Sequence, residues 1–475
     1  MNEFTISPTL NPQRVFILHK SEIEKRFDPF YYVPELLELE KKILAKKPKR
    51  LRDYVINISS GATPKTTESE KYYTDQENGI PFLRVQNLSS TGILEFSDCK
   101  YINPETHEGM LKRSQVTAGD LLVKITGVGR MAVASVAPQG FIGNINQHVC
   151  VIKTGSKVIS EMVAAFLNSD IGEKLASRRS TGGTRPALDY PALLSIPIVE
   201  NERILNITKN VIIQKQRNER EAEDLLKSID DYLIKELGIS LPSPPENILK
   251  NRMFLTSIKR ITNNRFDPNY HQTYFQELFI ALQNSKYPCS QIRQYASFQA
   301  GYAFKSTDYL EHSECLLITI KNIRQNLIDI SDATFLPNEF YDLYKDFQIK
   351  ENDLLIAMTG ATIGKVGIYK HIQKSLLNQR NGIIKPDRID STYLMNLLNL
   401  SIFQRIILRN SNGGAQPNIS ETDIMRILIP VPPIEVQRKI AQDITNVRLQ
   451  AQKLKDSTLE VLHKASKDIE DILLN

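Results

Sequence analysis

The sequence lacks the features of a membrane-spanning or secreted chain. In 475 residues no apolar run approaches the roughly 18–20 residues that a membrane span requires. The N-terminus, Met1 to Phe4, shows neither the basic start nor the apolar core of a signal peptide. The four cysteines are scattered and form no C-x-x-C pair. We therefore expect buried thiols in a reducing cytoplasm, in preference to a zinc site.

Catalytic motifs are missing as well. No G-x-G-x-x-G opens a βαβ unit, and the stretch from Gly360 to Val366 is one residue too short for a phosphate loop. There is no H-E-x-x-H, and the seven histidines do not fall at metal-ligand spacings. The Asn-Pro-Pro-aromatic and Asp-Pro-Pro-aromatic tetrapeptides, which hold the target base in amino-methyltransferases, are absent too. The sequence therefore predicts a non-enzymatic protein without catalytic residues, cofactor or metal.

What the chain does contain is a duplication. A series of landmarks in the first half returns in the second, in the same order and at nearly constant spacing. The offset changes only slightly, from 266 − 27 = 239 at the first landmark to 413 − 182 = 231 at the last. A period this long excludes a solenoid, whose repeats run about 20–50 residues. The landmarks are Arg26-Phe27-Asp28-Pro29 and Arg265-Phe266-Asp267-Pro268, Asp120-Leu121-Leu122 and Asp353-Leu354-Leu355, Asn146-Gln147 and Asn378-Gln379, and Gly182-Gly183 and Gly413-Gly414.

Each half begins with a mixed α+β part. Residues 121–125 and 354–358 read as buried strands that end in a Thr-Gly turn, and residues 148–152 and 381–384 as the strands that follow. Residues 161–175 and 391–408 have helical periodicity. We read Phe27-Asp28-Pro29 as a turn in which Asp28 caps the following segment. The predicted fold is α+β with two tandem homologous domains, at residues 1–199 and 241–432.

Each α+β part is followed by a long polar helix, within residues 200–240 and 433–475. The first is expected from Glu202 to Leu237, with Gly238 as its stop, and the second from Glu435 to Leu474. The second helix repeats apolar residues at alternating spacings of four and three, which is the seam of a coiled coil. Packing of each helix against its own domain is the competing interpretation. Two seams of similar length in one chain favour an antiparallel pair that acts as a spacer, with polar Gln214 and Asn218 specifying its register.

Two Gly-rich turns are the best candidates for a binding role. They comprise Gly182, Gly183, Thr184 and Arg185 in the first half, and Gly413, Gly414 and Gln416 in the second. Glycines allow close backbone approach and leave N–H groups free for an anion such as phosphate. In the major groove arginine can read guanine and glutamine can read adenine. A tight turn without a ligand is the competing interpretation.

Further polar residues recur at matching places and could contact phosphates or base edges. For any single one of them, a solvated loop position is the alternative. The formal charge of +6 permits a polyanionic partner without arguing for one strongly. These candidates are Arg84, Gln86, Asn87, Lys124, Thr126, Arg130, Asn146 and Gln147 in the first half, and Lys321, Asn322, Thr359, Lys365, Gln379 and Arg380 in the second.

The assembled pattern resembles the specificity subunit of type I restriction–modification systems. The resemblance rests on the landmarks above and on Ile196-Pro197 and Ile429-Pro430, which precede the helices. It also rests on Pro432-Pro433-Ile434-Glu435-Val436-Gln437 at the start of the last helix. It covers almost the whole chain. Each motif is weak alone, and their order and duplication make the combination specific.

The resemblance implies more than the residues show. It implies two target recognition domains that each read half of a bipartite DNA site, and two helices that form an antiparallel coiled coil and set the gap. It also implies docking of two adenine methyltransferase subunits, to which restriction motor subunits can be added, and no catalysis by this chain. Two other interpretations remain: a coiled-coil adaptor without DNA specificity, and the recognition part of a fused restriction–methylation system.

Overall fold

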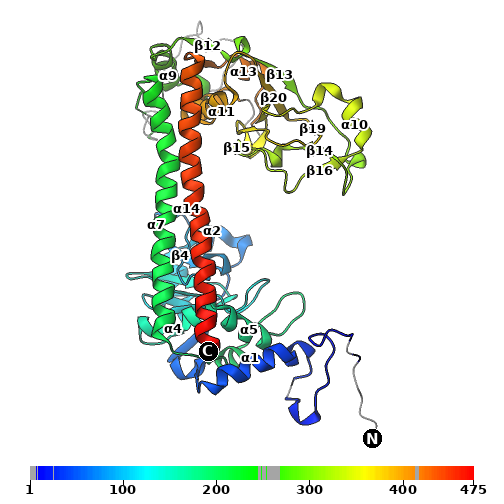
Figure 1. Cartoon of the computed structure of the whole chain (residues 1–475). Coiled ribbons are helices and arrows are strands. Elements are labelled where there is room, and N and C mark those ends of the chain that lie inside the picture. Colours follow the sequence, from blue (N-terminus) through cyan, green and yellow to red (C-terminus); the bar gives the residue numbers. More distant parts are fainter. Residues whose placement is uncertain are drawn as a thin grey trace. The chain divides into compact units, whose positions relative to one another are not determined.

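The computed structural model describes Ser7, residues 9–24 and 26–243, Ile248, Met253, and residues 268–411 and 417–475. The chain divides into two compact units. The first comprises residues 1–220 and 454–475, and the second comprises residues 221–453. Each unit therefore contains one mixed α+β part together with portions of two long helices, as the elements in Figure 1 show.

The first unit is built around two sheets. A four-stranded antiparallel sheet has the order β2-β10-β7-β8, and a five-stranded mixed sheet has the order β3-β5-β4-β9-β6. The pair β1-β11 closes the domain beside the long helix. The strands are β1 Lys49–Arg50, β2 Asn57–Ser60, β3 Tyr73–Thr74, β4 Ile80–Leu83, β5 Lys100–Ile102, β6 Gln115–Thr117, β7 Leu121–Lys124, β8 Ala134–Val136, β9 Ile142–Ile145, β10 Val149–Lys153 and β11 Pro197–Ile198. The α-helices before the long one are α1 Pro34–Ala45, α2 Ser69–Tyr72, α3 Pro104–Glu108, α4 Lys157–Asn168, α5 Asp170–Arg179 and α6 Tyr190–Leu194.

The second unit repeats this plan with different sheet sizes. A five-stranded sheet has the order β13-β20-β17-β18-β15, a three-stranded sheet the order β16-β14-β19, and β12 pairs with β21. The strands are β12 Cys289–Gln291, β13 Ala296–Ala300, β14 Cys315–Ile318, β15 Asn326–Leu327, β16 Thr334–Leu336, β17 Leu354–Ala357, β18 Val366–Ile368, β19 Ser375–Leu377, β20 Asn381–Pro386 and β21 Leu428–Pro430. The α-helices are α9 Thr273–Gln283, α10 Asn338–Leu343, α11 Ser391–Asn399, α12 Ser401–Asn410 and α13 Glu421–Met425.

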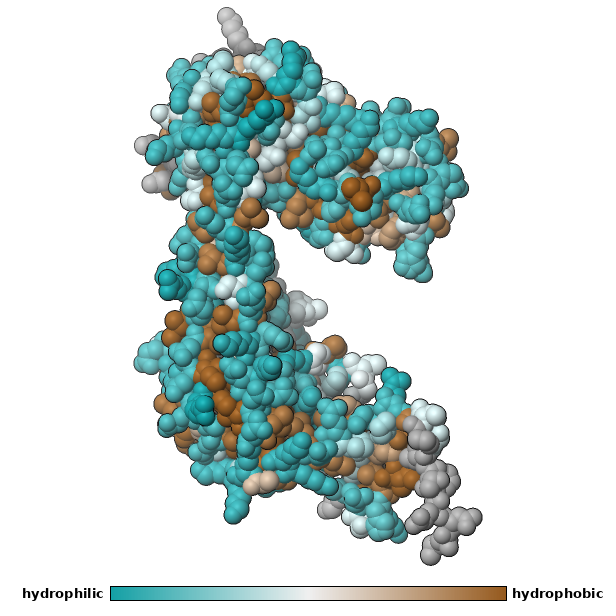
Figure 2. Space-filling view, in the orientation of Figure 1, coloured by the Kyte–Doolittle hydropathy of each residue, from teal (hydrophilic) through white to brown (hydrophobic). Residues whose placement is uncertain are grey.

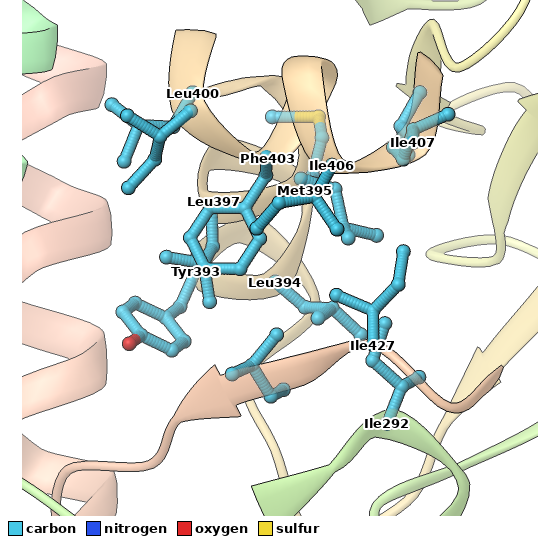
Figure 3. Close-up of a cluster of buried hydrophobic side chains, with 14 of the residues drawn as sticks. Ile292, Tyr393, Leu394, Met395, Leu397, Leu400, Phe403, Ile406, Ile407 and Ile427 are labelled. Carbon is cyan, nitrogen blue, oxygen red and sulfur yellow. The ribbon is translucent and has the colours of Figure 1, made fainter. Parts of the chain in front are cut away.

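The core of the second unit shows why its helices break where they do. Tyr393, Leu397 and Phe403, from α11 and α12, lie over Ile292 and Ile427 (Figure 3). All five side chains are at most 2% exposed. The two helices are separated at residue 400, and their counterparts α4 and α5 are separated at residue 169. Each single periodic segment that the sequence predicts is thus two helices. The first of each pair, α4 or α11, contacts strands, whereas α5 packs on α1 and α6, and α12 packs on α11 and α13.

The long helices are α7 Glu202–Leu237 and α14 Ile434–Leu474. They agree with the predicted ranges to within one residue. Gly238 adopts φ +62 after α7, and Ile239 N donates to Ile234 O at 3.0 Å, a glycine stop of the Schellman type. In the space-filling view the visible surface is mainly hydrophilic, with smaller hydrophobic patches (Figure 2).

Within each unit α7 and α14 pack against one another. In the first unit, Ile204 shares a core with Ile469 and Leu473, while Asn218 contacts Thr458, so the two helices run antiparallel. In the second unit, the Tyr232 hydroxyl donates to Asp443 at 2.6 Å. The predicted α+β fold, with tandem domains and a paired set of long helices, is confirmed. The division by residue number into four segments stays a prediction.

One local prediction at the domain entrance is wrong. Asp28 precedes the short helix Pro29–Tyr32, but its side chain makes no capping hydrogen bond there. Instead, both carboxylate oxygens accept from Arg26, at 2.8 and 2.7 Å. The same guanidinium donates to Arg179 O and Ser180 O, which ties the entrance to the end of α5. The fork of the arginine satisfies the carboxylate better than a single backbone N–H would. Phe266 and Asp267 lie outside the described residues.

Candidate nucleic-acid interface

The turn after β7 is joined by backbone hydrogen bonds to the segment that follows the Gly-Gly turn. Gly127 N donates to Pro186 O at 3.0 Å, and Leu188 N donates to Ile125 O at 2.8 Å. Thr126 forms a bridge with Ala187 between these two bonds. The Thr-Gly landmark and the Gly-Gly landmark therefore form one local structure, although about 60 residues of sequence separate them.

The second unit repeats these bonds. Gly360 N donates to Pro417 O at 3.0 Å, Ile419 N donates to Met358 O at 3.0 Å, and Thr359 bridges to Asn418. The equivalence holds bond by bond, so the sequence duplication is also a duplication of backbone geometry at this place.

The Asn-Gln landmark joins the same structure. Asn146 N donates to Leu83 O, and Asn378 N donates to Ile318 O, each at 3.0 Å. The carbonyl of His148 accepts from Ile125 N at 3.0 Å, as that of Arg380 accepts from Met358 N at 2.9 Å. We call the three joined segments of each unit the loop frame: residues 125–127, 146–148 and 186–188 in the first, and 358–360, 378–380 and 417–419 in the second.

A glycine makes the close approach at the loop frame possible in each unit. A Cβ on Gly61 would lie 1.8 Å from the carbonyl oxygen of Ile145, and one on Gly301 would lie 2.0 Å from that of Asn378. Real Cβ atoms are not found at such distances, so only glycine fits. Sequence reasoning missed both residues. Their signal was a glycine just after a strand at the same place in both halves.

Side chains in and beside the first loop frame form a hydrogen-bonded chain. Thr63 donates to Gln147, whose amide lies 3.4 Å from Nε2 of His148, and Arg185 Nη2 lies 3.0 Å from the same Nε2. A guanidinium can only donate, so Nε2 accepts and the neutral ring carries its proton on Nδ1. Burial and the nearby charge of Arg185 both lower the pKa of His148, which favours this neutral form. Sequence reasoning missed His148.

The second loop frame presents a cation directly. Gln379 and Arg380 are exposed, and Arg380 adopts the left-handed region with φ 67, which is uncommon for a residue other than glycine. Tyr302, 38% exposed, is bonded to this frame because its carbonyl accepts from Gln379 N at 2.8 Å. Thr359, Arg380, Asn381 and Asn418 line a pocket together with Ala300 and Met358.

The predicted Gly-rich turn of the first unit is exposed. Gly182 has φ +95, and a Cβ there would meet the Arg185 carbonyl oxygen at 2.9 Å, so its glycine is structurally required. Gly183 faces open space, and Thr184 and Arg185 are exposed beside it. The corresponding Gly413, Gly414 and Gln416 lie outside the described residues.

Several other predicted contacts are occupied within the protein. Asn87 and Asn322 are 1% and 2% exposed, and each caps its own turn by accepting from the backbone at 2.8 and 2.9 Å. The Lys124 ammonium donates to Val128 O and Arg130 O at 2.7 and 2.9 Å, and burial lowers its pKa. These three side chains hold loops in place and do not face solvent.

Other predicted cations are engaged by acids or lie outside the frame. Arg130 donates to Asp170 at 2.7 Å. Arg84 and Gln86 both bind Asp98, at 3.1 and 2.8 Å. The Lys321 ammonium lies 3.1 Å from Asp332, and Lys365 is half-buried just before β18. Asn146 is buried, and its side chain accepts from His148 N. Thr126 is half-buried in the loop frame.

The described residues offer little for metal chemistry. Among them, no group of three or more His, Cys, Asp or Glu side chains could hold an ion. The four cysteines are free thiols, two buried and two partly buried, and burial raises the pKa of each.

Within the described part of the chain, no helix has the length and apolar character needed to cross a membrane.

Comparison with known proteins finds similarity to one family. Residues 289–462 match the type I restriction modification DNA specificity domain. The chain is 29% identical over 190 residues to the MjaVIII specificity subunit of Methanocaldococcus jannaschii, a match that covers 38% of this chain and 44% of that protein. This chain thus spans less than half of that relative. Over 434 residues it is 21% identical to the EcoBI specificity subunit of Escherichia coli, covering 89% of this chain and 83% of the relative.

Solved structures give a similar result at low similarity. A chain from a study of complex assembly in a type I restriction–modification system is 15% identical, with TM-score 0.44 and coverage of 90% of this chain and 95% of that one. The specificity subunit from M. genitalium is 12% identical, with TM-score 0.40, covering 90% of this chain and 94% of that one. The sequence matches confirm the resemblance that the motifs indicated: the chain is similar to the specificity subunits of type I restriction–modification systems.

Proposed function

We propose that this chain is the DNA-recognition subunit of a type I restriction–modification complex, and that each unit reads one half of a bipartite DNA site. The observation that carries the proposal is the loop frame. Both units repeat the same backbone hydrogen bonds, but they present different side chains on them, such as His148 in one and Arg380, with its positive φ, in the other. A shared backbone with varied exposed polar groups is what two readers of different sequences require.

The long helices have a separate role in this proposal. In each unit α7 and α14 pack antiparallel, which supports a helix pair that sets the gap between the two half-sites. We propose that the same helices dock two adenine methyltransferase subunits and that restriction motor subunits can join the complex in the cytoplasm. Methylation is then performed by the partners, and this chain contributes the choice of site without a cofactor of its own.

The test is a genome-wide map of methylated adenines in cells with and without this chain, with the partner methyltransferase kept constant. The proposal expects one split motif, two short half-sites around a fixed gap, to disappear when the chain is absent. A coiled-coil adaptor without DNA specificity would leave the map unchanged. Such an adaptor would also fail to show salt-dependent DNA binding by the purified complex, because phosphate contacts release counterions.

A further inference from the structure

The cations of the two units fall into paired and unpaired groups. Arg84, Arg130 and Lys321 each lie within 3.1 Å of an aspartate. Arg185 and Arg380 are exposed and have no acidic partner among the residues that the structure describes. A paired cation must give up its carboxylate before it binds DNA. Of the described arginines that the sequence analysis proposed as DNA contacts, Arg185 and Arg380 are therefore the ones that need not do so.

These two arginines lie at or beside the same part of the loop frame. Arg380 is the structural equivalent of His148, because both carbonyls accept the same hydrogen bond from the strand-end residue. In the first unit the guanidinium of Arg185 lies 3.0 Å from the imidazole of His148. Each unit thus has one exposed arginine at or beside this loop of its frame, although the positive φ of Arg380 is not shared by His148. The arginine is supplied by the Gly-Gly turn in the first and by the Asn-Gln loop in the second.

The surroundings of Arg380 fit a base edge better than a phosphate. The pocket beside it is lined by the half-buried hydroxyl residue Thr359 and the exposed amide residue Asn418. Asn381 also lines it, but this residue is 1% exposed and its amide nitrogen donates to Asn378 O and Gln379 O, so it supports the loop. Hydroxyl and amide groups can both donate and accept hydrogen bonds, whereas phosphate oxygens only accept. A base edge in the major groove presents both donors and acceptors, and guanine offers O6 and N7 to a bidentate arginine.

We propose that Arg380 is a base-reading residue of the second unit and Arg185 that of the first, so that each half-site contains a G·C pair contacted in the major groove. The proposal rests on the DNA-recognition function proposed above and names the base chemistry of that site. His148 is a positioning residue in this scheme, because it contacts the guanidinium of Arg185 and not the DNA.

The experiment uses the full chain with its methyltransferase partners and compares adenine methylation maps. Arg380→Gln is expected to relax one G·C position of one half-site, with discrimination there falling roughly 5- to 150-fold. The other half-site and the gap should stay unchanged. Arg380→Lys keeps the charge but not the bidentate fork, and it should relax the same position. The matched control is Arg388→Gln, an exposed arginine of the same unit that is paired with Asp387 and lies outside the frame.

The His148 arm tests positioning separately. His148→Leu removes the acceptor and should weaken discrimination at one position of the other half-site. His148→Gln places an amide oxygen near the site of Nε2 and should restore it. If the ring of His148 only filled space, the amide oxygen of His148→Gln would not restore discrimination, and the positioning role would be refuted.

The outcomes are distinguishable. If the unmutated chain gives no split motif, the proposed function itself fails. Base reading by Arg380 is refuted if a split motif exists but a half-site lacks a G·C pair. It is also refuted if Arg380→Gln leaves discrimination unchanged at every G·C position. A uniform loss of methylation with all positions still discriminated would make Arg380 a phosphate contact, and would refute the proposal equally.

Discussion

The buried polar contact between the long helices of the first unit predicts an unusual pattern of stability. Asn218 is 3% exposed in the seam between α7 and α14. Its Nδ2 donates to the Thr458 hydroxyl at 3.0 Å, and its Oδ1 accepts from Gln214 at 2.7 Å. A typical net contribution of about 1 kcal/mol per hydrogen bond puts the cost of Asn218→Ala at about 2 kcal/mol of the free energy of unfolding.

A double replacement should behave differently from the single one. Asn218→Leu alone removes one partner and leaves the other polar groups in an apolar seam, so it should also destabilise. Asn218→Leu combined with Thr458→Val replaces both partners by apolar groups and should lie within about 1 kcal/mol of the unmutated chain. The polar pair would then serve register more than stability, as single buried asparagines do in other coiled coils.

Urea unfolding of the unmutated chain, Asn218→Leu, Thr458→Val and the double variant, followed by circular dichroism, measures this cycle. Methylation mapping of the double variant supplies the second readout, because loss of register specification should broaden the gap between half-sites. Additive losses in the double variant would contradict the reasoning, since they would mean that the hydrogen bond contributes net stability beyond its desolvation. An unaltered gap with restored stability would remove the register role.

Three further predictions concern the spacer, the loop frame and pH. Seven helical residues inserted between Gln214 and Ala222, with a matching insertion in α14, should lengthen the gap by about 10 Å, or about 3 base pairs. Methylation mapping checks this, and an unchanged gap would defeat the spacer proposal. Gly301→Ala places a Cβ 2.0 Å from a carbonyl oxygen and should lower the unfolding free energy by about 1–3 kcal/mol. Gly183→Ala, in open space, is the control in the same thermal melts. Arg130 donates a hydrogen bond to Asp170 and lowers the pKa of this carboxyl group below its ordinary value of 3.8. At acidic pH the unfolded chain therefore binds more protons than the folded chain. The stability that ionised Asp170 contributes is present above pH 3.8 and is lost as the pH falls through the pKa of Asp170 in the folded chain. The stability difference from Asp170→Asn should shrink between pH 6 and pH 3, and a constant difference would contradict it.

The architecture was predictable because its signals are local or repeated. The 3.6-residue period and the glycine stop located α7 from Glu202 to Leu237, as the structure has it. The order of the landmarks revealed two related domains. The breaks at residues 169 and 400 were not predictable from periodicity, because they depend on tertiary packing of α5 against α1 and α6 and of α12 against α13.

The candidate site was only partly predictable. The repeated Thr-Gly, Asn-Gln and Gly-Gly landmarks do meet in space, as one loop frame in each unit. The sequence could not separate a free polar side chain from one already bound. Asn87, Asn322 and Lys124 looked like readers, but nearby backbone groups occupy them.

The sequence by itself determined the duplication, the two long helices and the landmarks that build the loop frame, since these are properties of residue order and period. Only the tertiary structure decided which cations stay free. Arg130 meets Asp170 across 40 residues, and Arg185 meets His148 across 37. Such pairs form when the chain folds and brings distant loops together, and the pattern of charges along the sequence does not specify them.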